Sequence, residues 1–133
     1  MQCPQIDLWE CIRGYVRGRT LLLGGTKHVL VECVLKASTF TYVVEPALEA
    51  ARRLRKMFPG LFVVWSDYED TQITGLFDTV IVDADDGAAM EIASRRTAPG
   101  GKLVLLKPRG DLGDIWDIYG TFKEHGITIA RRK

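Results

Sequence analysis

The sequence predicts an α/β protein with three layers: a doubly wound, mostly parallel sheet and helices on both of its faces. Short apolar segments alternate along the chain with segments of helical length and period. Most of these apolar segments are continuous in Val, Ile, Leu and aromatic residues, as in strands buried on both faces of a parallel sheet. The 133 residues fit one domain, with an N-terminal helix in residues 1–18 and an α/β core in residues 19–133.

Six segments are predicted to be strands, because each is apolar and is bounded by turn residues. They are Thr20–Leu23, Phe40–Val44, Leu61–Trp65, Thr79–Asp83, Leu103–Lys107 and Ile127–Ala130. With right-handed crossovers between them, we expect the strand order 3-2-1-4-5-6 and parallel pairing throughout. Ile127–Ala130 follows a predicted helix, and too few residues remain after it for an antiparallel seventh strand.

Five segments have helical length and apolar period. They are Asp7–Val16, Lys27–Ala37, Pro46–Met57, Gly87–Thr97 and Asp114–His125. Asp7 is a plausible N-cap for the first of these helices, and Gly126 a stop for the last. Between the third and fourth strands, Asp67–Leu76 is polar and predicts a loop or one short turn.

Composition excludes several classes of protein. A net charge of +1 argues against general nucleic-acid affinity, which needs a concentrated basic surface. No apolar run approaches the roughly 18–20 residues that cross a bilayer. The first residues, Met1–Gln5, lack the basic and apolar regions of a secretion signal, so we expect a cytoplasmic protein.

Three cysteines, Cys3, Cys11 and Cys33, have neither CxxC nor zinc-ligand spacing. In a reducing compartment they are expected to be thiols. The chain has no Asn and only three Gln, a trend of thermophile proteins, in which intracellular disulfides are tolerated. A Cys3–Cys11 or Cys11–Cys33 bridge therefore remains an alternative.

The candidate site lies where the parallel strands end, because open α/β sheets bind ligands outside the carboxyl ends of their strands. The residues that follow the first four strands are Gly24-Gly25-Thr26, Glu45, Ser66-Asp67-Tyr68 and Asp83-Ala84-Asp85-Asp86. The region from Met57 to Ile92 has eight acidic residues and no Lys or Arg. An acidic rim suits a cationic or hydroxyl-rich ligand better than a bare phosphate.

Five motifs in order resemble a known family. They are Leu21–Gly25, Val44–Pro46, Ser66-Asp67, Phe77–Asp83 and Ala98–Leu105. Together they resemble the Rossmann-like class I S-adenosylmethionine-dependent methyltransferases over roughly residues 18–108. The chain departs from the family's first motif, since Leu22 replaces its acidic residue and only Gly24 matches its GxGxG loop, with Thr26 and His28 at the other two glycine positions.

The resemblance implies a role for the first two strand ends. The backbone of Gly24, Gly25 and Thr26 would approach the methionyl part of S-adenosylmethionine, where no Cβ stands in the way of the glycines. Glu45 lies 21 residues after Gly24 and would accept hydrogen bonds from both ribose hydroxyls. The alternative for Glu45 is a cap of the following helix, stabilised by the helix dipole.

The other cofactor contacts implied by the resemblance come from the second, third and fourth strand ends. Asp67 would accept the adenine amino group, and Tyr68 or Pro46 would pack on the ring. Asp83 would border the cofactor, and Asp83 or Asp85 would orient or deprotonate the methyl acceptor. Asp67 could equally be an exposed turn residue.

No metal site is expected. Asp83-Ala84-Asp85 resembles the magnesium-binding motif of catechol-type O-methyltransferases, which place further oxygen ligands after their fifth strand. The corresponding residues here are Lys107-Pro108, which cannot bind a hard cation.

The resemblance implies a small methyltransferase that uses S-adenosylmethionine and an unidentified acceptor. A partner or a second copy in a homodimer would complete the acceptor pocket. The alternative is a non-catalytic Rossmann-like binding or assembly module that has lost its glycine loop. A dinucleotide-binding domain is a third reading, which the missing GxGxxG motif disfavours.

Overall fold

The computed structural model describes residues 7–25, 27–107, 112–122 and 125–133. Its helices are α1 (Asp7–Ile12), α2 (His28–Ala37), α3 (Leu48–Met57) and α4 (Gly87–Arg96), with 3-10 turns η1 (Arg13–Tyr15) and η2 (Tyr68–Asp70). Its strands are β1 (Arg19–Leu23), β2 (Phe40–Glu45), β3 (Phe62–Trp65), β4 (Phe77–Val82), β5 (Thr97–Leu105), β6 (Trp116–Phe122) and β7 (Ile127–Arg132). Within these residues no helix is both long and apolar enough to cross a bilayer.

The seven strands form one sheet in the order β3-β2-β1-β4-β5-β7-β6. The first five strands in this order are parallel, which confirms the predicted arrangement 3-2-1-4-5. η2 lies in the segment predicted to be a loop or one short turn between the third and fourth strands. The α/β fold class is therefore as predicted.

The prediction for the C-terminal part of the sheet was wrong. Asp114–His125 was expected to be a helix, but it contains β6, which pairs antiparallel with β7. β7, which contains the predicted sixth strand Ile127–Ala130, also runs antiparallel to β5, with Leu103 opposite Ala130. β6 can be read either way. Trp116, Ile118 and Phe122 have the even spacing of a strand, whereas Ile115, Ile118 and Phe122 fall on one helix face. The β6–β7 hairpin extends the sheet beyond β5 and leaves β6 as the edge strand, and Gly126 adopts the positive φ of 67° between the two strands.

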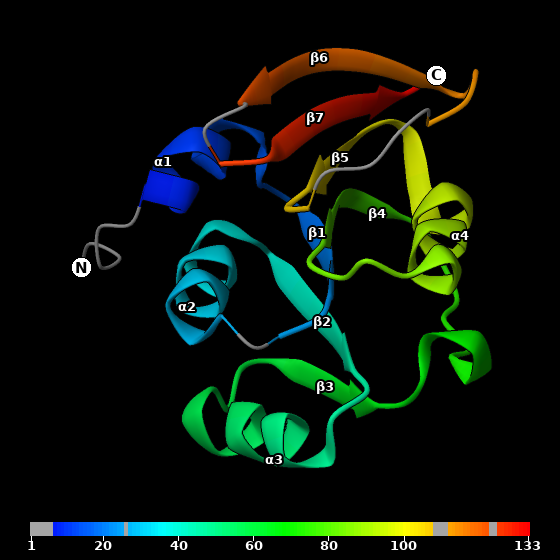
Figure 1. Cartoon of the computed structure of the whole chain (residues 1–133). Coiled ribbons are helices and arrows are strands. Elements are labelled where there is room, and N and C mark those ends of the chain that lie inside the picture. The colour runs from blue at the N-terminus through cyan, green and yellow to red at the C-terminus, as the bar shows by residue number, and fades with distance from the viewer. Residues whose placement is uncertain (1–6, 26, 108–111, 123–124) are drawn as a thin grey trace.

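Helices cover both faces of the sheet, as Figure 1 shows: α1, α2 and α3 pack on one face, and α4 with η2 packs on the other. The parallel strands alternate between the two cores. Leu22 and Ile81 pack toward the α1–α3 side, whereas Leu21 and Val80 pack toward the α4 side. The core therefore rigidly positions the carboxyl ends of β1, β2 and β4.

The apolar residues of the N-terminal segment pack against the core where the structure describes it. Ile12 and Val16 are buried, and Leu8 and Tyr15 pack against the same core. Residues 1–6 lie outside the described residues, so the N-cap prediction for Asp7 stays a prediction. Cys11 and Cys33 are not joined in a disulfide, and Cys3 lies outside the described residues.

Candidate functional site

The site lies at the point where the order of the sheet reverses. The chain runs from β1 outward through β2 and β3, then returns to β4 on the other side of β1. Backbone hydrogen bonds join the strand ends: the Gly24 N–H donates to the Val44 carbonyl over 3.0 Å, and the Asp83 N–H donates to the Leu23 carbonyl over 2.9 Å. Such a reversal opens a crevice between the loops that leave the two central strands, here β1 and β4.

Gly24 requires the absence of a side chain. Its φ is +100°, and a Cβ there would lie 2.7 Å from the Asp83 carbonyl oxygen and 3.3 Å from the Tyr68 hydroxyl. Gly25 is small for a different reason, since its Cβ would lie 2.5 Å from Leu54 Cδ1 of α3. Gly24 thus borders the crevice, whereas Gly25 permits α3 to pack closely. Thr26 lies outside the described residues.

Glu45 lies at the end of β2 with only 3% of its surface exposed. Its Oε1 accepts the Gly25 N–H and its Oε2 accepts the Ala47 N–H, each over 2.8 Å. Ala47 is the N-cap residue of α3, so the carboxylate joins the turn after β1 to the start of α3. Each carboxylate oxygen retains capacity for a further hydrogen bond. The helix-capping alternative is therefore present in the structure, and it does not exclude the ribose contact.

Asp83 follows β4 and is held by a cation. Lys27 Nζ lies 2.8 Å from Asp83 Oδ1 and 2.9 Å from Oδ2. The Asp83 side chain is 2% exposed and that of Lys27 45%. Sequence reasoning did not anticipate this pair, although both residues follow adjacent strands at the same edge of the sheet. Asp83 is consequently a poor candidate for a free general base, because the ammonium engages both of its carboxylate oxygens.

Tyr68 in η2 is buried, with its hydroxyl close to Gly24. Burial raises the pKa of Tyr68 well above its ordinary value, and the negative charges of Glu45, Asp86 and Asp83 raise it further. The phenol therefore stays protonated at physiological pH and can donate a hydrogen bond into the crevice.

The remaining predicted residues lie at the rim. The Asp67 side chain is exposed, and its carbonyl accepts the hydroxyl of Thr71 over 2.7 Å. Pro46 is half-buried, and its carbonyl accepts the indole N–H of Trp65 over 3.0 Å. Asp85 is exposed. Thus Gly24, Glu45, Tyr68 and Asp83 come together, and Asp67 and Asp85 lie farther out.

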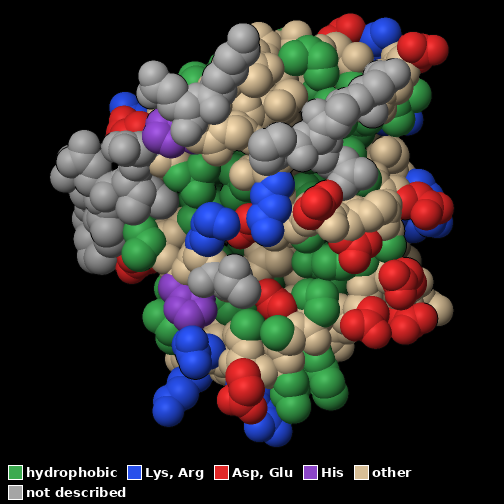
Figure 2. All heavy atoms as spheres, in the orientation of Figure 1, with side chains coloured by type: hydrophobic (Ala, Val, Ile, Leu, Met, Phe, Trp, Pro, Cys, Tyr) green, Lys and Arg blue, Asp and Glu red, His purple; other side chains and the backbone are tan. Residues whose placement is uncertain are grey.

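The acidic rim predicted from the sequence is visible on the surface. In Figure 2, acidic side chains gather on the right of the face, over η2 and α4. Exposed members on these elements include Glu69, Asp70 and Glu91. Across the described part of the chain, no group of three Cys, His, Asp or Glu side chains is placed to bind a metal ion, and Pro108 lies outside that part.

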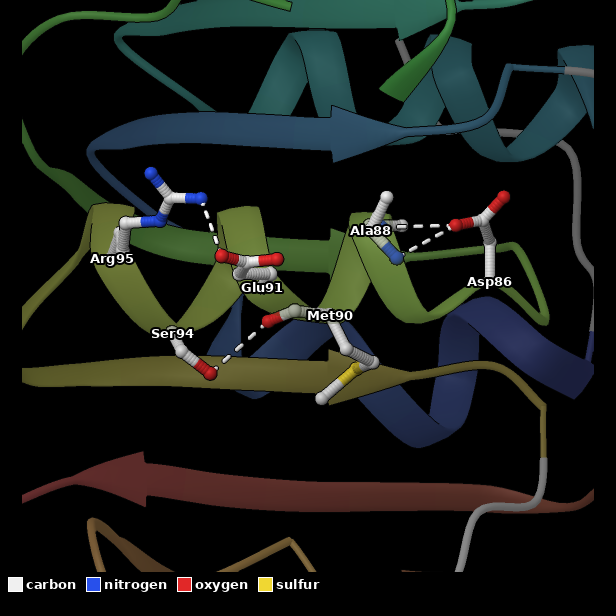
Figure 3. Close-up of polar contacts among 7 residues, drawn as sticks. Asp86, Ala88, Met90, Glu91, Ser94 and Arg95 are labelled. Atoms are coloured by element: carbon white, nitrogen blue, oxygen red, sulfur yellow. Dashed lines mark hydrogen bonds and ion pairs between the residues drawn. The ribbon is translucent and has the colours of Figure 1, made fainter. Parts of the chain in front are cut away.

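Asp86 has a structural role at the start of α4. Its Oδ1 accepts the N–H groups of Ala88 and Ala89 over 2.7 and 3.4 Å, as drawn in Figure 3. Asp86 is therefore the N-cap of α4, the helix that covers the face of the sheet opposite to α1, α2 and α3.

We expect Asp86→Ala to lower the free energy of unfolding by about 1 kcal/mol, because two helix-terminal N–H groups lose their acceptor. Urea denaturation measures this change. Glu91→Ala on the same helix is the control, since it removes only the exposed ion pair with Arg95 and should cost less than about 0.5 kcal/mol. Equal losses in the two variants would contradict the capping role.

Several solved structures that are similar to this chain are described as methyltransferases. No protein-family model matches the sequence, and no curated protein matches it either. The Escherichia coli protein yhhF, assigned as a methyltransferase, aligns with a TM-score of 0.79 and 12% identity over 99% of this chain and 89% of its own. The N-methyltransferase NodS of Bradyrhizobium japonicum WM9, in complex with S-adenosyl-L-homocysteine, aligns with a TM-score of 0.72 and 16% identity over 94% and 82% of the two chains.

A third similar structure is the amino pentose methyltransferase CalS10 of Micromonospora echinaspora, bound to S-adenosylmethionine. It aligns with a TM-score of 0.65 and 22% identity over 84% of this chain, which spans 55% of the CalS10 chain. The present chain thus has the fold of the class I S-adenosylmethionine-dependent methyltransferases.

Proposed function

We propose that this chain is a small methyltransferase that binds S-adenosylmethionine at the reversal between β1 and β4. The observation that carries the proposal is the buried Glu45 carboxylate beside the Gly24-Gly25 turn, at the position where this fold binds its ligand. The similar structures of NodS and CalS10, whose complexes contain S-adenosyl-L-homocysteine and S-adenosylmethionine, support the same cofactor.

The residues of the crevice suit this cofactor. Glu45 would hold the ribose hydroxyls through the hydrogen-bonding capacity that its two backbone contacts leave. Gly24 would let the backbone approach the ligand, and Tyr68 would donate its hydroxyl hydrogen. Asp67 would meet the adenine amino group at the rim, with Pro46 beside the ring. When bound, S-adenosylmethionine supplies a methyl group already activated on a sulfonium.

The chain's own contribution to methyl transfer is alignment more than acid–base chemistry. Asp83 is paired with Lys27, so we assign it to orienting groups in the crevice and not to removing a proton. Asp85, exposed at the rim, remains the candidate for contact with the acceptor. Holding the reactants in line supplies most of the rate gain for a group that is already activated. A partner or a second copy would complete the acceptor side of the pocket.

A melting-temperature screen tests the proposal, with S-adenosylmethionine, S-adenosylhomocysteine, NAD and no ligand as its four arms. A ligand at about 100 times its Kd adds about 2.7 kcal/mol, which for a domain of this size raises Tm by about 5–10 °C. We expect this shift with the two adenosyl ligands and none with NAD. A shift with NAD alone would favour a dinucleotide-binding domain. No shift with any ligand would favour the non-catalytic assembly module.

A further inference from the structure

The Lys27–Asp83 ion pair joins the segments that follow β1 and β4, and its two members are unevenly exposed. Asp83 is almost fully buried, whereas nearly half of the Lys27 side chain is exposed. The pair therefore presents its cation to the surface and keeps its anion buried. Lys27 is the N-cap residue of α2, and its carbonyl accepts the Val31 N–H over 3.0 Å, so its backbone is anchored to that helix.

Stability alone does not account for a charge pair in this position. Taking a carboxylate out of water costs free energy that its partner repays only in part, so a buried pair is weak evidence for a stabilising role. The backbone of Asp83 borders Gly24, since its carbonyl oxygen is the atom that a Cβ at Gly24 would strike. The two oxygens of the buried Asp83 carboxylate orient the Lys27 ammonium and leave one of its three N–H donors for an anionic group.

Two zones of opposite character therefore flank the Gly24-Gly25 turn. On the β2 side, the Glu45 carboxylate suits neutral hydroxyl groups. On the β4 side, the Lys27 ammonium suits a carboxylate. A nucleoside that carries an amino-acid tail has a hydroxyl pair at one end and a carboxylate at the other, and so matches both zones.

We propose that Lys27 binds the α-carboxylate of the ligand's amino-acid end and that Asp83 is the positioning residue that holds Lys27 in place. This inference rests on the proposed function. Thr26 and His28 occupy glycine positions of the related motif, and Lys27 lies between them in the sequence. The inference assigns a ligand contact near this turn to the side-chain cation of Lys27. Lys27 thereby determines specificity for ligands with a carboxylate over nucleosides without one.

Calorimetric titration with two thioether ligands tests the assignment. S-adenosylhomocysteine carries the α-carboxylate, and its decarboxylated analogue, 5′-deoxy-5′-(3-aminopropylthio)adenosine, keeps every other group. We expect the wild-type chain to bind S-adenosylhomocysteine about 10–100-fold more tightly than the analogue, as one hydrogen-bonded contact between charged groups predicts.

Variants of the pair should change this ratio in a defined way. Lys27→Met should reduce it to within about threefold of unity by weakening S-adenosylhomocysteine alone. Lys27→Arg should retain most of the ratio because the cation remains. Asp83→Asn should lower it, since Lys27 is no longer held. Lys36→Met is the matched control on α2, where Lys36 pairs with Glu32 at 3.6 Å, and it should leave the ratio unchanged.

The outcomes separate this inference from the function on which it rests. Equal affinity of the wild-type chain for both ligands would overturn the role of Lys27 and leave the adenosyl site standing. An unchanged ratio in Lys27→Met would overturn it as well. Failure of the wild-type chain to bind either ligand would remove both the site and the inference. The comparison of two ligands on the wild-type chain needs no variant, so it holds even where a substitution prevents folding.

Discussion

Gly24→Ala is expected to lower the free energy of unfolding by about 2–4 kcal/mol and to abolish adenosyl-ligand binding. An alanine at a φ of +100° is strained wherever it lies. Here its Cβ would also lie 2.7 Å from the Asp83 carbonyl oxygen, a backbone atom that cannot move without displacing the end of β4. The substitution therefore separates the two strand ends that form the crevice. Urea denaturation and calorimetric titration with S-adenosylhomocysteine measure the two effects.

Gly14→Ala is the control for the Gly24 variant. Gly14 lies in η1, has no positive φ, and would place its Cβ in open space. Its replacement should change stability by less than about 1 kcal/mol and leave binding intact. A Gly24→Ala protein as stable as the wild type, with unchanged ligand affinity, would show that the close approach of β1 and β4 is not required.

Glu45→Ala is expected to cost about 2–5 kcal/mol of unfolding free energy, because the buried N–H of Gly25 and the partly buried N–H of Ala47 lose a charged acceptor. At a low temperature at which the variant remains folded, we expect its affinity for S-adenosylhomocysteine to be about 10–100-fold lower through loss of the ribose contact. A loss of stability with no change in affinity would leave Glu45 with the helix-capping role alone.

Glu49→Ala serves as the control for Glu45 on the next helix. Glu49 lies in the first turn of α3, and its side chain is exposed and pairs with Arg52 on the surface. Its removal should cost less than about 1 kcal/mol and should not affect binding. Comparable losses of unfolding free energy in the two variants would show that the Glu45 carboxylate stabilises the fold no more than an exposed carboxylate does.

The parallel part of the sheet could be predicted from the sequence because its strands are apolar on both faces. Such segments, of which Leu21–Leu23 is an example, fit few arrangements other than a parallel sheet once helices separate them. The β6 segment was misread because its apolar residues satisfy two periods at once, and only its pairing with β7 selects the strand. Local pattern carries no information about a partner that follows later in the chain.

The candidate site was predictable in its location but not in its contacts. Parallel strands end at one edge, so Gly24, Glu45 and Asp83 had to lie near one another. The Lys27–Asp83 pair and the approach of Tyr68 to Gly24 depend on side chains that reach across 56 and 44 residues of sequence. Those contacts follow from the packing of α2 and η2, which no spacing rule specifies.

The measurement that tests the central claim most directly is a titration of the labelled protein with S-adenosylhomocysteine, followed through its backbone amide chemical shifts. We predict the largest changes at the amides of Gly24, Gly25 and Ala47, which surround the turn and the Glu45 carboxylate. The amides of Gly100 and Gly101, which lie near the amino end of β5 and thus at the opposite edge of the sheet, should be unaffected. Changes confined to that opposite edge, or no changes at millimolar ligand, would contradict an adenosyl site at the reversal between β1 and β4.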